Sequence, residues 1–200
     1  MDQKKALLTI QEYINSYFGT DPSGHDYSHM KRVAQWSKEL AQKEGADSFL
    51  CEVMGWLHDI GDSKLFDYPE HAKEQLVSLL IELGFTKETI DEILSVMDSV
   101  SFRKGQIPCS LPGKIVQDAD RLDAMGAIGI ARTFAYGGSR GQVIFSENQQ
   151  TANSIQHFYD KLLKLSTLMN TSAGRQEAER RHQFMLEFLE QFHKETNIQQ

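Results

Sequence analysis

The sequence predicts an all-α fold, a compact single-domain helical bundle that spans residues 1–200. Apolar residues recur at three- and four-residue intervals in one segment after another, which is the spacing of helices with one buried face. No segment of useful length alternates apolar and polar residues as a half-buried strand would. The prolines fall between the expected helices, at Pro22, Pro69, Pro108 and Pro112. A chain of 200 residues is long enough to bury the core of one such domain.

Five helices are expected before residue 100, each bounded by a capping residue, a proline or a glycine. Asp26 is suited to cap the second helix, and Gly45 to end it. Pro69 restarts the chain after the third helix, and Gly84 ends the fourth. In order, the expected helices cover residues 4–18, 26–44, 47 into the pair at 58–59, 69–84 and 86–97.

The second half of the sequence predicts three more helices. Residues 101–113 contain two prolines and two glycines and form a connector. A sixth helix follows; it carries Asp118 and is expected to run straight on to Arg132. Residues 136–150 hold three glycines and are expected to form a loop, either a lid or a plain surface loop. Two amphipathic helices in 151–195, with stripes over 155–169 and 184–192, pack on a core formed by residues 25–132.

Composition limits the binding partners and the cellular location that the protein is expected to have. The formal net charge of −7 argues against nucleic acid or an anionic membrane as the main partner, although a cation in a pocket would still attract a small anion. No apolar run approaches the roughly 20 residues that span a bilayer. We interpret Cys51 and Cys109 as free thiols and small core residues of a cytoplasmic protein. The sequence leaves the oligomeric state open, with a homodimer as one alternative.

Polar residues inside apolar helical stripes mark a candidate metal site. His58 and Asp59 stand side by side where the third helix gives way to a loop. His29 lies on the apolar face of the second helix, and Asp118 on that of the sixth. Burying such groups alone costs several kcal/mol, roughly 2–7, so they must share a partner. The same spacing points Asp120 to the opposite side of its helix, and therefore selects Asp118 as the fourth ligand.

Two imidazoles and two carboxylates indicate an open cation site. Without thiolate ligands, the set suits Mn²⁺, Mg²⁺, Fe²⁺ or Co²⁺ better than a closed structural zinc. Four protein ligands on an octahedral ion leave about two positions for water and a phosphate oxygen. Such an ion lowers the pKa of its water and neutralises charge on a phosphoryl group. The alternative is a cation that only joins helices.

The scattered series His29, His58-Asp59 and Asp118 resembles the metal site of the HD-domain phosphohydrolase superfamily. The strings H-D-Y-S-H-M-K-R-V, L-H-D-I-G-D-S-K and Q-D-A-D-R-L-D-A-M-G-A-I-G-I-A-R are similar to those of its small bacterial branch of the YpgQ type. The resemblance implies a helical bundle that holds one divalent cation, with Mn²⁺ favoured and Mg²⁺, Fe²⁺, Co²⁺ or Ni²⁺ as alternatives. It also implies a catalytic role for Asp62, which would position or deprotonate the attacking water. The alternative is that Asp62 caps the turn after Gly61.

Four further residues are candidates for binding substrate. Lys64 follows the H-D pair closely and matches the family's basic residue there. Arg32 lies three residues after His29, and Arg121 three after Asp118, so each borders the proposed site. Arginine binds two phosphate oxygens at once, although a solvated salt bridge is its common alternative. Asp123 would orient Arg121 or contact a sugar hydroxyl, unless it lies on the surface.

The predicted protein is therefore a metal-dependent phosphohydrolase with a small phosphorylated substrate, in particular a nucleotide. Resemblance to the YpgQ-type branch favours cleavage of a nucleoside triphosphate into monophosphate and pyrophosphate. A phosphomonoesterase acting on nucleoside monophosphates and a non-catalytic nucleotide sensor remain as alternatives. A diiron oxygenase on the same bundle is disfavoured, because only His71 stands between Asp59 and Asp118 to hold a second iron.

Overall fold

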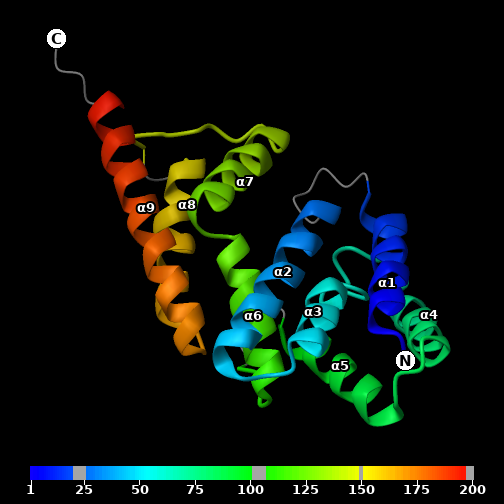
Figure 1. The fold of residues 1–200 in the computed structure, drawn as a ribbon. Coiled ribbons are helices and arrows are strands. Elements are labelled where there is room, and N and C mark those ends of the chain that lie inside the picture. The colour runs from blue at the N-terminus through cyan, green and yellow to red at the C-terminus, as the bar shows by residue number, and fades with distance from the viewer. Residues whose placement is uncertain (20–25, 101–106, 149–150, 197–200) are drawn as a thin grey trace. The chain divides into compact units, whose positions relative to one another are not determined.

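The computed structural model describes residues 1–19, 26–100, 107–148 and 151–196. Figure 1 shows helices joined by turns: α1 (Gln3–Phe18), α2 (Tyr27–Glu44), α3 (Ser48–Leu57), α4 (Pro69–Glu82), α5 (Lys87–Val100), α6 (Leu111–Asp123), α7 (Gly126–Ser139), α8 (Ser154–Asp160), the 3-10 helix η2 (Leu162–Leu168) and α9 (Ser172–Thr196). Within these ranges no strand forms, and bridge pairing is limited to Val143 with Asn153. The all-α prediction is confirmed. Among the described residues, no helix combines the length and the apolar character needed to cross a bilayer.

Internal contacts divide the chain into two compact units, residues 1–119 and residues 120–200. The boundary falls inside α6, which is one continuous helix. Because this helix contributes residues to both units, the expectation of a single domain stays a prediction.

In the first unit, α2 and α3 pack closely against each other. The reason is Gly55 of α3, where an added Cβ would lie 2.7 Å from the Cα of Ala34 and 2.8 Å from the Oγ of Ser37. No other residue fits this approach without moving backbone. His58 follows Gly55 by about one turn, and His29 precedes Ala34 by little more than one turn. The close packing of the two helices therefore draws both histidines to the same place.

The helix ends before the site follow their predicted chemistry. The Asp26 side chain caps α2 by accepting from the backbone N–H of His29 at 2.8 Å. Gly45 ends α2 with a left-handed φ of 72°, which glycine adopts without steric cost. The core beneath is built from fully buried side chains of several helices, among them Ile10, Ile14 and Met54. The first turn of α2 is thus fixed at its cap and along its buried face.

In the second unit, α7 packs on α9, and α8 and η2 complete the buried layer. The ring of Phe158 lies 6.1 Å from that of Phe134 and 5.8 Å from that of Phe188, centroid to centroid. Phe158 and Met185 are fully buried. This aromatic core gives the second unit its own apolar interior.

Three expectations about chain course are corrected. The sixth helix does not continue to Arg132: it ends at Asp123, and Gly126, with a φ of +66°, starts α7 in a new direction. The stripe over 155–169 belongs to two short elements, because the chain leaves the helical conformation at Lys161. α7 extends to Ser139 and takes up the start of the loop expected over 136–150, of which residues 149–150 lie outside the described ranges.

The predicted connector and the cysteines give mixed outcomes. Residues 101–106 of the connector lie outside the described ranges, and α6 begins at Leu111 within its remainder. Cys51 is a buried free thiol, as expected. Cys109 is exposed, so its interpretation as a core residue is wrong.

Candidate metal centre

His58 stands at the carboxyl end of α3 with its side chain buried. Its Nδ1 lies 2.9 Å from the carbonyl oxygen of Gly55. Because a carbonyl can only accept, Nδ1 carries the hydrogen and donates it. The neutral ring then presents the lone pair of Nε2, which is the atom a cation binds.

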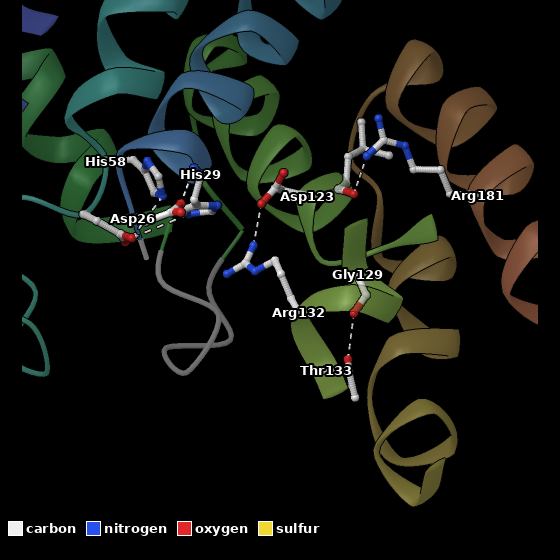
Figure 2. A network of polar contacts seen from close by, with 10 residues as sticks. Asp26, His29, His58, Asp123, Gly129, Arg132, Thr133 and Arg181 are labelled. Atoms are coloured by element: carbon white, nitrogen blue, oxygen red, sulfur yellow. Dashed lines mark hydrogen bonds and ion pairs between the residues drawn. The ribbon is translucent and has the colours of Figure 1, made fainter. Parts of the chain in front are cut away.

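His29 lies in the first turn of α2 and is completely buried. The two imidazole rings face each other edge to face, with their centroids 5.2 Å apart and their planes at 71°. Figure 2 shows both rings beside Asp26 at the start of α2. Two consecutive helices, α2 and α3, thus place two imidazoles at one point.

Asp59 brings a carboxylate to the same point. Its Oδ2 lies 3.4 Å from Nε2 of His58 and 3.7 Å from Nε2 of His29. Both separations exceed the usual 2.7–3.2 Å of a hydrogen bond. Ligands on one cation at about 2.0–2.2 Å lie roughly 3–3.5 Å from each other, so the 3.4 Å spacing suits a shared ion and the 3.7 Å spacing is slightly wider. The side chain of Asp59 is 14% exposed, which leaves the cluster reachable from solvent.

α6 supplies the next carboxylate. Asp118, the predicted ligand, is completely buried and keeps that role as a prediction. Ligand atoms of His29, His58 and Asp120 all lie within 4.8 Å of one another. Directing Asp120 away from the site was therefore wrong. The apolar stripe of a helix marks the side that enters the core, whereas Asp120 is only partly buried, as the rim of an open site requires.

Asp62 and Lys64 lie in the turn that follows. The N–H of Asp62 donates to the carbonyl of Asp59 at 3.2 Å, and Oδ1 of Asp62 accepts from the N–H of Lys64 at 2.9 Å. Asp62 therefore caps this turn, as the alternative interpretation held. The second oxygen of a carboxylate can still handle a proton, so the catalytic role stays a prediction. Lys64 is exposed, as a phosphate contact has to be.

The remaining predicted contacts sit on α2 and on the second unit. Arg32 is half-buried in α2. Arg121 is largely buried, and its Nη1 donates to the carbonyl of Leu168. Asp123 is buried and accepts from Nη1 of Arg132 at 2.5 Å (Figure 2). Arg132 was expected far along a straight helix; the break at Gly126 instead brings it to Asp123.

The donor set around His29 and His58 fits a divalent cation that favours nitrogen and oxygen. It contains imidazole nitrogens and carboxylate oxygens, and both cysteines stand elsewhere. Thiolate-free sites with partly exposed carboxylates are typical of catalytic rather than closed structural metals.

The comparisons with known proteins bear on this site. A family model described as HD domain matches residues 26–125, half of the chain. The chain is 38% identical to the uncharacterized protein YpgQ of Bacillus subtilis over 98% of its own length and 96% of that protein.

Solved structures agree. The Lin1889 protein of Listeria innocua superposes with a TM-score of 0.85 at 36% identity over the whole of both chains. A HD-superfamily hydrolase of Bacillus thuringiensis superposes with a TM-score of 0.82 at 39% identity, over 98% of this chain and all of that one. YpgQ in complex with ADP superposes with a TM-score of 0.82 at 37% identity, over 95% of this chain and 97% of that one.

The similar proteins match nearly the full chain, and the family model includes the residues of the cluster, His29, His58 and Asp59. They confirm the predicted enzyme class, an HD-type hydrolase. The chain belongs to the HD-domain family, as its H-D motif predicted.

Proposed function

We propose that this protein is a metal-dependent phosphohydrolase acting on a nucleotide. The observation that carries the proposal is the spacing of one oxygen of Asp59 from two imidazole nitrogens, 3.4 Å from His58 and 3.7 Å from His29. A divalent cation bound there supplies charge neutralisation to a phosphate oxygen and lowers the pKa of a coordinated water.

The fourth ligand comes from α6. Asp120 is the candidate that the ligand spacing supports, and Asp118 is the one that the apolar stripe predicted. Mn²⁺ binding by Asp118→Asn and Asp120→Asn separates them, because both changes keep the side-chain volume. We expect Asp120→Asn to weaken Mn²⁺ binding by on the order of 100-fold and Asp118→Asn to weaken it far less. The opposite order would restore Asp118 as the ligand.

The chain's own residues then hold the substrate and move protons. Asp62 positions or deprotonates the attacking water with the carboxylate oxygen that does not hold the turn. Lys64 receives the phosphates next to Asp62. Arg32, Arg121 and Asp123 are proposed as further contacts to phosphate oxygens or a sugar hydroxyl.

Within this class we favour cleavage of a nucleoside triphosphate into monophosphate and pyrophosphate, with Mn²⁺ as the cation. The near full-length similarity to YpgQ, whose structure is known in complex with ADP, supports a nucleotide. The donor set of imidazoles and carboxylates without thiolate supports Mn²⁺ over a closed structural zinc. A phosphomonoesterase acting on nucleoside monophosphates is the second candidate.

The test is to incubate purified protein with Mn²⁺ and each nucleoside triphosphate or monophosphate, and to measure pyrophosphate and orthophosphate separately. We expect pyrophosphate from triphosphates and no phosphate from monophosphates. Orthophosphate from monophosphates would establish the second candidate. Nucleotide binding without hydrolysis, with each divalent metal tried, would establish a sensor instead.

The role of Asp62 is tested by Asp62→Asn. The amide still accepts from the N–H of Lys64, so the turn persists, but it cannot take a proton. We expect turnover to fall by about 100-fold or more with Mn²⁺ retained. Near-normal turnover would limit Asp62 to holding the turn.

A further inference from the structure

The first unit contains a cavity of about 280 Å³ beside the turn that follows the H-D pair. It is bounded by the end of α1, the chain before α4 and the first turns of α4. None of its lining residues is a proposed metal ligand. They are Tyr17, Phe18, Leu65, Phe66, Asp67, Tyr68, His71, Ala72 and Gln75.

Aromatic rings form much of the wall. The ring of Phe66 lies 5.3 Å from that of Tyr17 and 5.9 Å from that of Phe18, centroid to centroid. Tyr68 is 78% exposed at the mouth, so its ring is available to a ligand rather than to the core. Such surfaces offer flat apolar faces on which another aromatic ring stacks.

The polar groups of the wall include donors and acceptors, and the carboxylate among them is an acceptor only. The hydroxyl of Tyr17 donates to Oε1 of Gln75 at 2.7 Å, which orients the Gln75 amide. The amide nitrogen then donates to Nε2 of His71 at 3.1 Å, so that nitrogen carries no hydrogen. Asp67 adds a carboxylate, and among the described residues neither a lysine nor an arginine lines the cavity. This chemistry disfavours a phosphate and favours a flat ring that carries N–H donors.

The cavity is tied to the metal ligands by successive backbone turns. The N–H of Asp62 bonds to the carbonyl of Asp59 at 3.2 Å, and the N–H of Phe66 bonds to the carbonyl of Asp62 at 3.0 Å. Asp59 belongs to the cation cluster and Phe66 to the cavity wall, with Lys64 between them. The chain thus sets out a cation site, a cationic side chain and an aromatic cavity in that order.

We propose that this cavity binds the base of the nucleotide, an inference that rests on the proposed function. The ring stacks on Tyr68 and Phe66, and Asp67 accepts from an exocyclic amino group. The site therefore prefers adenine or cytosine, which carry such a donor, over uracil or thymine, which present an oxygen there. The phosphates lie toward Lys64 and the cation cluster.

The test uses Tyr68→Ala, with Ile81→Ala as its matched control. Ile81 is 61% exposed on α4, the helix that begins directly after Tyr68, and does not line the cavity. We expect Tyr68→Ala to raise the KM for ATP about tenfold at unchanged kcat, since base stacking binds ground and transition state alike. Ile81→Ala should match the wild type in both constants.

Adenosine alone, titrated calorimetrically without metal, separates this inference from the catalytic one. We expect the wild type to bind adenosine more tightly than uridine, Asp67→Asn to lose that preference, and Tyr68→Ala to lose adenosine binding. These results would support the base site even if no nucleotide were hydrolysed. No adenosine binding by the wild type, or equal binding by wild type and Tyr68→Ala, would overturn it.

Discussion

Two polar clusters, one in each unit, are built on opposite principles. In the second unit, Glu177 accepts from Arg180 at 2.7 and 3.0 Å and from Arg181 at 2.7 Å, so its charge is met by hydrogen bonds within the chain. In the first unit, Asp59 lies 3.4 and 3.7 Å from the imidazoles of His58 and His29. Both spacings are longer than a hydrogen bond, and the shorter one lies inside the range of ligands on a shared cation. The cluster in the first unit suits a bound ion, whereas the cluster in the second unit holds helix α9 together.

Titration supports the comparison. Burial raises the pKa of Glu177, whereas the hydrogen bonds and positive charges of Arg180 and Arg181 lower it. The lowering outweighs the effect of burial, so the pKa of Glu177 lies below its ordinary value. The hydrogen bond to Glu177 in turn raises the pKa of Arg180. Glu177 and Arg180 therefore stabilise each other's charged forms, and this cluster needs no bound ion to neutralise it.

The largest effect is expected from removing a ligand in the first cluster. His58→Ala should abolish high-affinity Mn²⁺ binding and lower turnover by on the order of 1,000-fold, roughly 4 kcal/mol of transition-state stabilisation. Metal content after dialysis and the rate of product release measure the two effects.

Glu177→Gln is the control, because it removes a charge of the second cluster. It should keep metal content and turnover at wild-type values. A metal-loaded, active His58→Ala protein would show that the histidine cluster is not the metal centre.

The next effect concerns which unit the cation stabilises. Burial, with added repulsion from Asp47 and Glu92, raises the pKa of the Cys51 thiol to about 12, so Cys51 reacts with iodoacetamide only when the first unit opens. Mn²⁺ at about 100 times its Kd should slow that reaction about 100-fold. Exposed Cys109 serves as the internal control and should react at one rate with or without metal. If Mn²⁺ slowed the reaction of both thiols equally, or of neither, the cation would not be bound to the folded first unit.

A smaller effect tests how the first cluster is assembled. Gly55→Ala places a methyl group 2.7 Å from the Cα of Ala34, which forces α2 and α3 apart. We expect a loss of about 1–3 kcal/mol in unfolding free energy, together with weaker Mn²⁺ binding. Gly138→Ala, in α7 with no atom within 4 Å of the added methyl, should leave both unchanged or slightly raise stability. Thermal unfolding and metal titration of the two variants decide the point.

How far the sequence predicts the molecule depends on whether a signal is local. Helix ends followed from local chemistry, as at Asp26 and Gly45, and the apolar stripes placed His29 and His58 on inward faces. Asp120 escaped the same rule because α6 is buried on nearly all sides, at residues 115–119 and 121–123, so no single face of the helix identifies the ligand. The turn at Gly126 also escaped it, since only the left-handed φ distinguishes it from a helical glycine.

The aromatic cavity was beyond prediction for a different reason. Its wall combines residues from the end of α1 with others from the start of α4, and no spacing along the chain relates Tyr17 to Gln75. Their hydrogen bond exists only through tertiary packing. The sequence therefore predicts the H-D motif and the types of residue that bind the metal. It does not predict that the end of α1 and the start of α4 meet beside them to form a cavity.

The smallest effect is expected in the second cluster and depends on pH. The folded-state pKa of Glu177 lies below that of the unfolded chain, so its stabilisation is complete above about pH 4.5 and is lost as the pH falls through the lower folded value. Glu177→Gln keeps the shape and an acceptor oxygen but removes the charge, and should cost less than about 1 kcal/mol at neutral pH because the pair is partly solvated. Denaturant unfolding of wild type and variant should therefore differ slightly at pH 7 and converge in acid. If the two unfolding free energies still differed in acid, Glu177 would act through packing. The cluster in the second unit would then not be held together by charge pairing.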